Sequence, residues 1–190
     1  MVRFFLTFLV LQAALFGAEL TPWAQRFLVE PWTNQLAAIS AGLVTLADPD
    51  VVAAGKVLRS TRNGFAVSIE AGCNGVEATI VLLAAVLAFP APWKNKLVGL
   101  LAGVVAVQGL NVVRVISLCY LGQWDIQIFE WAHLYVWQAL IMLDVLIVWL
   151  VWVRTLPRVP DSRGGGDVPP GGAGRPGKPA GGGSAATAAG

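Results

Sequence analysis

The stretch LVGLLAGVVAVQGLNVVRVISL, residues 97–118, carries a single charged side chain, Arg114. A helix of about 20 apolar residues is long enough to cross the ~30 Å hydrocarbon core of a bilayer. The stretch therefore predicts a transmembrane helix. This decides the class of fold, because water-soluble domains seldom contain so long an apolar run.

Three further apolar stretches lie on either side of this one, at residues 4–20, 76–92 and 134–153. We expect all three to cross the bilayer. The apolar run that begins at Val76 is short, because it ends at Phe89 before two prolines, so its helix should start within Cys73–Gly75 or lie where the bilayer is thinned. The sequence thus predicts an all-α integral membrane protein with about four transmembrane helices.

The composition of the chain agrees with this class. Hydrophobic residues make up 56% of the sequence and charged residues 13%, whereas soluble domains carry roughly 25% charge. The net charge of +2 is too small to indicate a nucleic-acid partner. The two cysteines have no zinc-binding spacing, and we expect neither a metal nor a cofactor.

Basic residues beside the predicted spans indicate the orientation of the chain. Arg3 precedes the first span, Lys94 and Lys96 lie between the second and third, and Arg154 follows the fourth. Short loops rich in Lys and Arg remain in the cytoplasm. We therefore predict that both termini are cytoplasmic.

The segment between the first two spans, residues 21–72, is then extracytoplasmic. Trp23 to Ala47 has the apolar spacing of a helix, which we expect Pro31 to interrupt. Asn63-Gly64 lies between two apolar runs and is a strong signal for a β-hairpin. We expect a small helix and hairpin outside the membrane.

The end of the chain differs from the rest. Residues 159–190 consist mainly of Gly, Pro and Ala and cannot bury a core. We predict a membrane-embedded domain at residues 1–158, followed by a disordered cytoplasmic tail at 159–190.

The predicted topology brings three reactive side chains to one depth. Cys73 precedes the second span, Arg114 lies near the outer end of the third, and His133 opens the fourth. Taken singly, each has a structural explanation: an inert buried thiol, an arginine that reaches for the headgroups, or an interfacial histidine. Ionisable residues within spans are rare and mark functional sites, so their convergence favours chemistry at the outer face.

Acyl transfer is the chemistry that suits these three groups. Cys73 would attack a peptide carbonyl and form a thioester, and the start of a helix would favour its thiolate. His133 would carry the proton as base and then as acid. Arg114 would stabilise the developing oxyanion.

Four other polar residues are candidates for supporting roles or for binding substrate. Asn111 lies one turn before Arg114 on the same helix face and is suited to orienting it or holding a substrate backbone. Asn74, Glu77 and Glu70 surround Cys73 in a glycine-flanked segment, where they would tune the site or contact substrate.

Two residues serve as internal comparisons. Cys119 has no glycine turn or helix start beside it, so we expect a structural role. Asp144 lies deep in the fourth span, where we favour an interhelix hydrogen bond over a proton relay.

Three motifs occur in order along the chain: Glu70-Ala-Gly-Cys73-Asn-Gly-Val-Glu77, then Asn111-Val-Val-Arg114, then Ala-His133-Leu. Together they resemble the exosortase/archaeosortase family, most closely the exosortase H type. The resemblance covers about residues 65–153. Many members have around eight spans, so this chain departs from them in size.

The resemblance implies a membrane cysteine protease and transpeptidase of the bacterial inner membrane, with its active site facing the periplasm. Cys73 matches the nucleophile, Arg114 its electrostatic partner and His133 the acid/base. The implied partners are exported proteins that end in a sorting signal, composed of a short motif, a transmembrane helix and a basic cluster. The implied motif is similar to Ile-Pro-Thr-Leu followed by tryptophan, and the implied acceptor is a lipid or a glycan.

Two other functions remain open at this stage. A non-enzymatic membrane scaffold or assembly subunit would use Arg114 and Asp144 for packing, and its Cys73 would be unreactive. Thiol redox chemistry would use Cys73 and Cys119, although they do not form a Cys-x-x-Cys pair. The accessibility of Cys73 to a membrane-impermeant maleimide separates these functions.

Overall fold

A computed structural model describes residues 2–157, and the predicted tail at 159–190 lies outside the described residues. The chain is helical apart from one small sheet. The elements, in order, are α1 (Val2–Glu19), α2 (Pro22–Ala24), the π-helical η1 (Gln25–Val29), α3 (Glu30–Val44), β1 (Val51–Ala54), β2 (Val57–Ser60), β3 (Ala66–Ser68), α4 (Val76–Ala88), α5 (Trp93–Trp124), α6 (Ile126–Trp131), the π-helical η2 (Ala132–Val136) and α7 (Trp137–Thr155).

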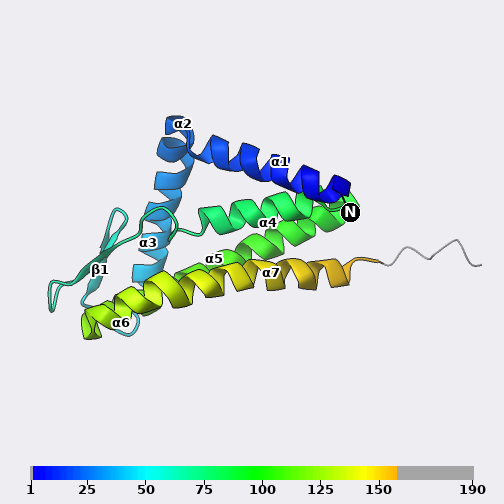
Figure 1. Cartoon of the computed structure of the whole chain (residues 1–190). Helices are drawn as coiled ribbons and strands as arrows, with labels where there is room; N and C mark the ends of the chain where they lie inside the picture. Colours follow the sequence, from blue (N-terminus) through cyan, green and yellow to red (C-terminus); the bar gives the residue numbers. More distant parts are fainter. Residues whose placement is uncertain (1, 158–190) are drawn as a thin grey trace, which may run out of the picture. The chain divides into compact units, whose positions relative to one another are not determined.

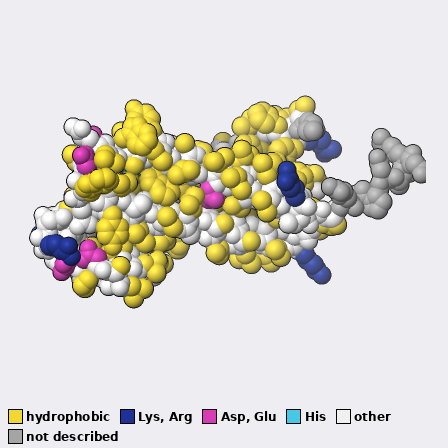
Figure 2. All heavy atoms as spheres, turned by 90° about the horizontal axis from the view of Figure 1, so that it is seen from below, with side chains coloured by type: hydrophobic (Ala, Val, Ile, Leu, Met, Phe, Trp, Pro, Cys, Tyr) yellow, Lys and Arg dark blue, Asp and Glu magenta, His cyan; other side chains and the backbone are white. Residues whose placement is uncertain are grey.

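Three helical stretches of residues 2–157 are long and apolar enough to cross a membrane: Val2–Glu19, Trp93–Trp124 and Ile126–Thr155. Their outer surfaces carry large apolar side chains, such as Val105, which is 73% exposed. Figure 2 shows hydrophobic side chains over the middle of the molecule and Lys and Arg side chains near its two ends. This distribution is that of an integral membrane protein.

The helix expected at 76–92 is shorter than predicted. It runs from Val76 to Ala88, about 20 Å at 1.5 Å per residue, because Pro90 and Pro92 follow and prolines end helices. This helix, α4, packs against α1, α5 and α7, and Figure 1 shows it lying along α1. Of the four predicted spans, three have the full length and α4 is a short apolar helix.

Pro31 does not interrupt the helix as we expected. It occupies the first turn of α3, directly after the π-helical turns of η1. The π-helical turns immediately before Pro31 accommodate its ring and its missing N–H within the helix. The helical segment therefore continues from Pro22 to Val44.

The predicted hairpin is confirmed, and it belongs to a larger sheet. Strands β2 and β3 pair antiparallel, with Val57 opposite Ser68, and the connection includes Gly64 at φ 74°. We did not predict the third strand, β1, which pairs with β2 through a turn at Gly55. The sheet order is β1-β2-β3.

The core is divided between the sheet region and the helices. One apolar cluster joins α3 and the sheet to the C-terminal half of α5, through Leu36, Leu58 and Val115. A second cluster fills the space between α4, α5 and α7, through Leu82, Val107 and Val145. The first cluster fixes the sheet over the ends of the helices where the candidate site lies.

Candidate active site

A glycine-flanked loop holds Cys73 in front of α4. Gly72 and Gly75 have φ angles of 84° and 73°, which only glycine adopts readily. The Cys73 amide donates to the carbonyl of Glu70 at 2.9 Å. The loop therefore turns sharply on both sides of Cys73 and delivers the thiol immediately before the first helical turn.

Asn74 anchors this loop. Its side chain is 1% exposed; the amide donates to Thr33 Oγ1 at 3.1 Å, and Oδ1 accepts from the Val76 N–H at 3.0 Å. The Asn74 carbonyl accepts from Trp32 Nε1 at 3.2 Å. Asn74 thus ties the Cys73 loop to α3 and to the first residue of α4, which is a structural role.

The thiol, the imidazole and the guanidinium meet at this loop. The Sγ atom of Cys73 lies 3.7 Å from His133 Nε2 and 3.9 Å from Nδ1. Arg114 Nη2 donates to the same sulfur at 3.5 Å. Both ring nitrogens are within reach of the thiol proton, since catalytic hydrogen bonds are often long in the absence of substrate.

Arg114 is buried and fixed. Its side chain is 2% exposed, and Nη1 donates to the carbonyl of Gly72 at 3.1 Å. Within residues 2–157 no carboxylate forms a salt bridge with it. A buried cation without a counter-ion costs free energy, so the Arg114 charge by itself favours negative charge on the neighbouring sulfur or on a bound substrate oxygen.

His133 is oriented by an aromatic ring. Phe129, one helical turn earlier, stacks on the imidazole with an interplanar angle of 7° and a centroid distance of 5.7 Å. Phe65 from the β2–β3 connection packs edge-on against Phe129. In the described part of the chain no carboxylate accepts a hydrogen bond from His133. Packing against Phe129, rather than a hydrogen bond to an acid, therefore orients the imidazole.

A cavity of about 120 Å³ opens beside these residues. Its lining combines five polar side chains, among them those of Cys73, Arg114 and His133, with apolar residues from the sheet region and from α5 and α6. The lining residues are Val67, Ser68, Ile69, Glu70, Cys73, Arg114, Val115, Leu118, Phe129 and His133. The cavity has room for a small acyl group next to the sulfur, and its polar groups converge on one point.

Burial raises the pKa of the Cys73 thiol above its ordinary value, and this effect exceeds the opposing effect of the Arg114 charge. Glu77 and Glu70 raise the pKa further. We expected the helix start to favour the thiolate, and the structure differs because the sulfur is desolvated. The resting residue is therefore a thiol, and the His133 imidazole lies within reach of its proton.

The predicted supporting residues differ in position. Glu77 Oε1 accepts from the Gly72 amide at 2.6 Å, so Glu77 and Arg114 hold the two ends of residue 72. Glu70 lines the cavity and accepts from Lys56 Nζ at 2.6 Å; this bond lowers the pKa of its carboxyl. Asn111 is fully buried, and neither of its amide atoms has a hydrogen-bond partner within residues 2–157.

The structure agrees with the role expected for Cys119 but not with the one expected for Asp144. Cys119 is 1% exposed in the cluster beneath the sheet, as expected of a structural thiol. The Oδ2 atom of Asp144 is buried without a hydrogen-bond partner in the described chain, so the interhelix hydrogen bond that we expected is absent there. Within residues 2–157 no group of three His, Cys, Asp or Glu residues is placed to hold a metal ion.

Sequence reasoning missed two residues that shape the site. Phe129 stands four residues before His133, a spacing that puts both side chains on one helix face, and this signal was available. Thr33 accepts a hydrogen bond from the Asn74 side chain, which is 41 residues away in sequence. No local sequence pattern predicts such a contact.

Comparison with known protein families gives one match. A family model described as transmembrane exosortase, Exosortase_EpsH, matches residues 2–150. No curated protein and no solved structure matches the chain. The matched range includes Cys73, Arg114 and His133, and it covers most of the described residues. On this match, the chain belongs to the transmembrane exosortase family.

Proposed function

We propose that this protein is a membrane cysteine peptidase and transpeptidase that cleaves the C-terminal sorting signals of exported proteins. Membership of the exosortase family supports a sorting role. The observation that carries the proposal is the contact of the Cys73 sulfur with both the His133 imidazole and the buried Arg114 guanidinium. A thiol, a base and an uncompensated cation within one small cavity are suited to acyl transfer.

The acylation step uses these three residues in turn. His133 takes the proton from Cys73, and the sulfur attacks the carbonyl carbon of the scissile peptide. The carbonyl oxygen becomes an oxyanion, whose charge Arg114 balances. His133 then gives the proton to the leaving amine, the C–N bond breaks, and a thioester on Cys73 remains.

The second step releases the product. A water or an amine attacks the thioester carbonyl, and His133 accepts the proton of the attacking group. The C–S bond then breaks, and His133 returns the proton to the departing Cys73 sulfur, which becomes the thiol again. Attack by water gives hydrolysis, whereas attack by an amine of a lipid or a surface glycan gives transpeptidation. Arg114 stabilises the oxyanion again, because the same carbonyl oxygen develops negative charge.

The bilayer supplies the geometry of substrate binding. We place both termini in the cytoplasm and the site at the periplasmic face of the bacterial inner membrane. The transmembrane helix of a sorting signal would then hold the preceding motif at the depth of Cys73. Confinement of enzyme and substrate to one membrane raises their effective concentration.

Co-expression with a tagged substrate tests this function. The substrate ends in an Ile-Pro-Thr-Leu-Trp motif, a transmembrane helix and a basic cluster, and its length is followed by immunoblot and mass spectrometry. We expect the wild-type enzyme to shorten it and Cys73→Ala to leave it whole, since the nucleophile is lost. Cys119→Ala is the matched control and should retain cleavage.

Two outcomes would contradict the proposal. Cleavage by Cys73→Ala at the wild-type rate would exclude a Cys73 thioester. No cleavage by the wild type across a panel of motif variants, together with a Cys73 inert to maleimide, would favour the scaffold function. The mass of the new C-terminus distinguishes hydrolysis from transfer to an amine.

A further inference from the structure

Strand β3 forms a free edge of the small sheet. The sheet order is β1-β2-β3, so β3 pairs on one side only, with β2. Natural edge strands are commonly blocked by a charged side chain, a proline or a bulge. Ala66, Val67 and Ser68, which make up β3, include no charge and no proline, and their register with β2 is continuous. The unpaired side of β3 is therefore able to accept a further strand.

The register determines which backbone groups lie on that free side. The Phe65 carbonyl accepts from the end of β2 at 2.8 Å, and the Ile69 N–H donates at 3.0 Å to the carbonyl just before β2. Because consecutive strand residues direct their backbone groups to alternate sides, those of Phe65, Val67 and Ile69 face β2. The N–H and C=O groups of Ala66 and Ser68 then face outward. Both residues are exposed, and within residues 2–157 no backbone hydrogen bond outside the sheet involves them.

This free edge leads to the nucleophile. The next outward-facing carbonyl after Ser68 is that of Glu70, which accepts the Cys73 N–H at 2.9 Å. A strand rises about 3.3 Å per residue, so Ser68 and Glu70 are at most about 7 Å apart along the edge. A peptide paired with Ala66 and Ser68 would therefore continue past the turn that carries Cys73.

The cavity at Cys73 lies along the same edge. Its lining includes residues 67–70, together with the Cys73 thiol and His133. Val115 and Leu118, both buried, add an apolar surface from α5. The cavity thus joins a strand edge to the reactive side chains, so an extended backbone that pairs with β3 has its carbonyl groups beside the nucleophile.

The apolar surface indicates which side chains the peptide should carry. Val67 packs against the core cluster that contains Val115, whereas Ala66 and Ser68 are exposed. An added strand has the same alternation of side chains. Every second side chain of the peptide would face Val115 and Leu118, and the others would face water. The ligand that suits this edge is an extended segment with apolar side chains at alternate positions.

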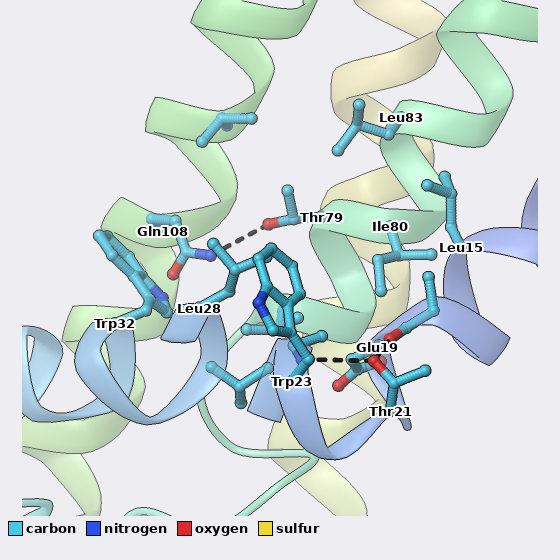
Figure 3. A pocket seen from close by; sticks show the side chains of 15 residues that line it. Leu15, Glu19, Thr21, Trp23, Leu28, Trp32, Thr79, Ile80, Leu83 and Gln108 are labelled. Atoms are coloured by element: carbon cyan, nitrogen blue, oxygen red, sulfur yellow. Dashed lines mark hydrogen bonds between the residues drawn. The ribbon is translucent and has the colours of Figure 1, made fainter. Parts of the chain in front are cut away.

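A second, larger cavity lacks such an edge. It lies between α1, η1, α4 and α5 and shares no lining residue with the cavity at Cys73. Figure 3 shows Leu15, Ile80 and Leu83 around it, with the Gln108 amide bonded to Thr79 Oγ1 at 3.0 Å. Its lining comes almost entirely from helices, whose backbone groups are bonded internally. It therefore offers no strand with which an extended peptide could pair.

We propose that an extended peptide binds the free edge of β3 as an additional strand, through the outward N–H and C=O groups of Ala66 and Ser68, with its scissile carbonyl at Cys73. In this mode of recognition main-chain hydrogen bonds give affinity and alternate side chains give specificity. The inference rests on the proposed function, because the peptide is the motif of the sorting signal.

The proline of the motif sets the orientation of the bound strand. Proline has no N–H, so within a sheet its nitrogen faces away from the neighbouring strand. In Ile-Pro-Thr-Leu-Trp the leucine lies two residues after the proline and faces the same way. The threonine between them then donates its N–H to β3.

Binding of synthetic peptides to the full-length Cys73→Ala chain in detergent tests this pairing. The peptides contain the motif and a fluorescent label, and affinity is measured by fluorescence anisotropy. N-methylation of the threonine removes an N–H that pairs with β3, whereas N-methylation of the leucine removes one that faces away. We expect the first peptide to bind about tenfold more weakly than the unmodified peptide, and the second to bind within about twofold of it.

Two proline variants test the same edge from the protein side. Ser68→Pro removes an outward N–H of β3. The Asp50 carbonyl accepts the Thr61 N–H at 2.7 Å, so by the same alternation Ala53 faces outward on β1, at the opposite edge of the sheet. We expect Ser68→Pro to weaken peptide binding about tenfold and Ala53→Pro to retain it. Thermal unfolding midpoints show whether both variants keep the fold, since proline is tolerated where a strand N–H faces outward.

The outcomes separate this inference from the peptidase function. Equal affinities of the two N-methylated peptides, or a larger loss with the leucine peptide, would exclude the pairing with β3. Absence of binding by the unmodified peptide, or binding that survives a folded Ser68→Pro, would place the peptide elsewhere. Cleavage of the unmodified peptide by the wild type is scored separately. Cleavage without the alternation would retain the peptidase and reject the strand, whereas alternation without cleavage would retain the strand and reject the peptidase.

Discussion

At the scale of single residues, Arg114 is the charged side chain with the largest influence on the Cys73 thiol. It donates to both the Cys73 sulfur and the Gly72 carbonyl, so it orients the nucleophile as well as supplying charge. Burial nevertheless raises the pKa of Cys73 above its ordinary value, and Arg114 offsets only part of that rise. Under the proposed function, His133 would therefore have to take the proton of Cys73 when the substrate binds.

The pH dependence of Cys73 alkylation follows from these opposing effects. Only the thiolate reacts, so the rate of labelling by iodoacetamide should rise with pH and reach half its maximum above the ordinary cysteine value of about 8.5. Arg114→Gln removes the charge that lowers the pKa, so its midpoint should lie at still higher pH. Arg114→Lys keeps the charge and should lie nearer to the wild type.

Arg59→Gln is the control for this titration, because Arg59 lies on β2 and does not contact the sulfur. Its midpoint should equal that of the wild type, measured in a Cys119→Ala background. A midpoint that moves to lower pH in Arg114→Gln would show that Arg114 does not favour the thiolate.

At the scale of elements, the turn into α4 determines where the nucleophile lies. Gly75 has φ 73° and immediately precedes the first residue of α4. A Cβ atom at this position would approach Gln108 Oε1 to 2.8 Å and Asn111 Nδ2 to 3.1 Å. The buried amide of Asn111 thus packs beneath the turn, which explains its burial more directly than a contact with substrate.

Gly75→Ala should therefore destabilise the nucleophile loop. Left-handed backbone costs a non-glycine residue about 1–2 kcal/mol, and the contact with the two amides adds to this. We expect loss of most substrate cleavage and a lower midpoint of thermal unfolding in detergent, measured on the purified chain.

Gly109→Ala is the matched comparison within α5. A Cβ there meets nothing within 4 Å, and alanine is the better helix former. Its cleavage and unfolding midpoint should equal or exceed those of the wild type. Equal behaviour of the two variants would show that the turn at Gly75 tolerates a side chain.

At the scale of the whole molecule, the number of crossings depends on α4. Three helices have the length to span, whereas α4 covers only about 20 Å at 1.5 Å per residue. Figure 1 shows the start of α1 and the end of α7 at one end of the helices, with the sheet at the other. This arrangement agrees with an even number of crossings, in which α4 crosses a bilayer that is locally thinned.

Cysteine labelling in intact spheroplasts tests this topology. Arg62→Cys in the sheet connection and Lys94→Cys after α4 are made singly in a chain with Cys73→Ala and Cys119→Ala. With four crossings, a membrane-impermeant maleimide should label residue 62 and should reach residue 94 only after lysis. Labelling of both positions before lysis would mean that α4 does not cross.

The sequence by itself determined the membrane class and the candidate residues. Length and apolarity predict spans without any tertiary contact, because the bilayer requires them. The Asn63-Gly64 hairpin was equally readable, since turn geometry is local. The order of spans further indicated that Cys73, Arg114 and His133 reach one depth, because successive helices alternate direction.

Only the tertiary structure decided how these groups act on one another. The desolvation of Cys73, the stacking of Phe129 on His133 and the hold of Thr33 on Asn74 depend on segments that meet through packing. Apolar periodicity and the placement of charges predict which residues enter the membrane. The pKa of a side chain and the shape of a binding cavity are instead set by neighbours that are distant in sequence.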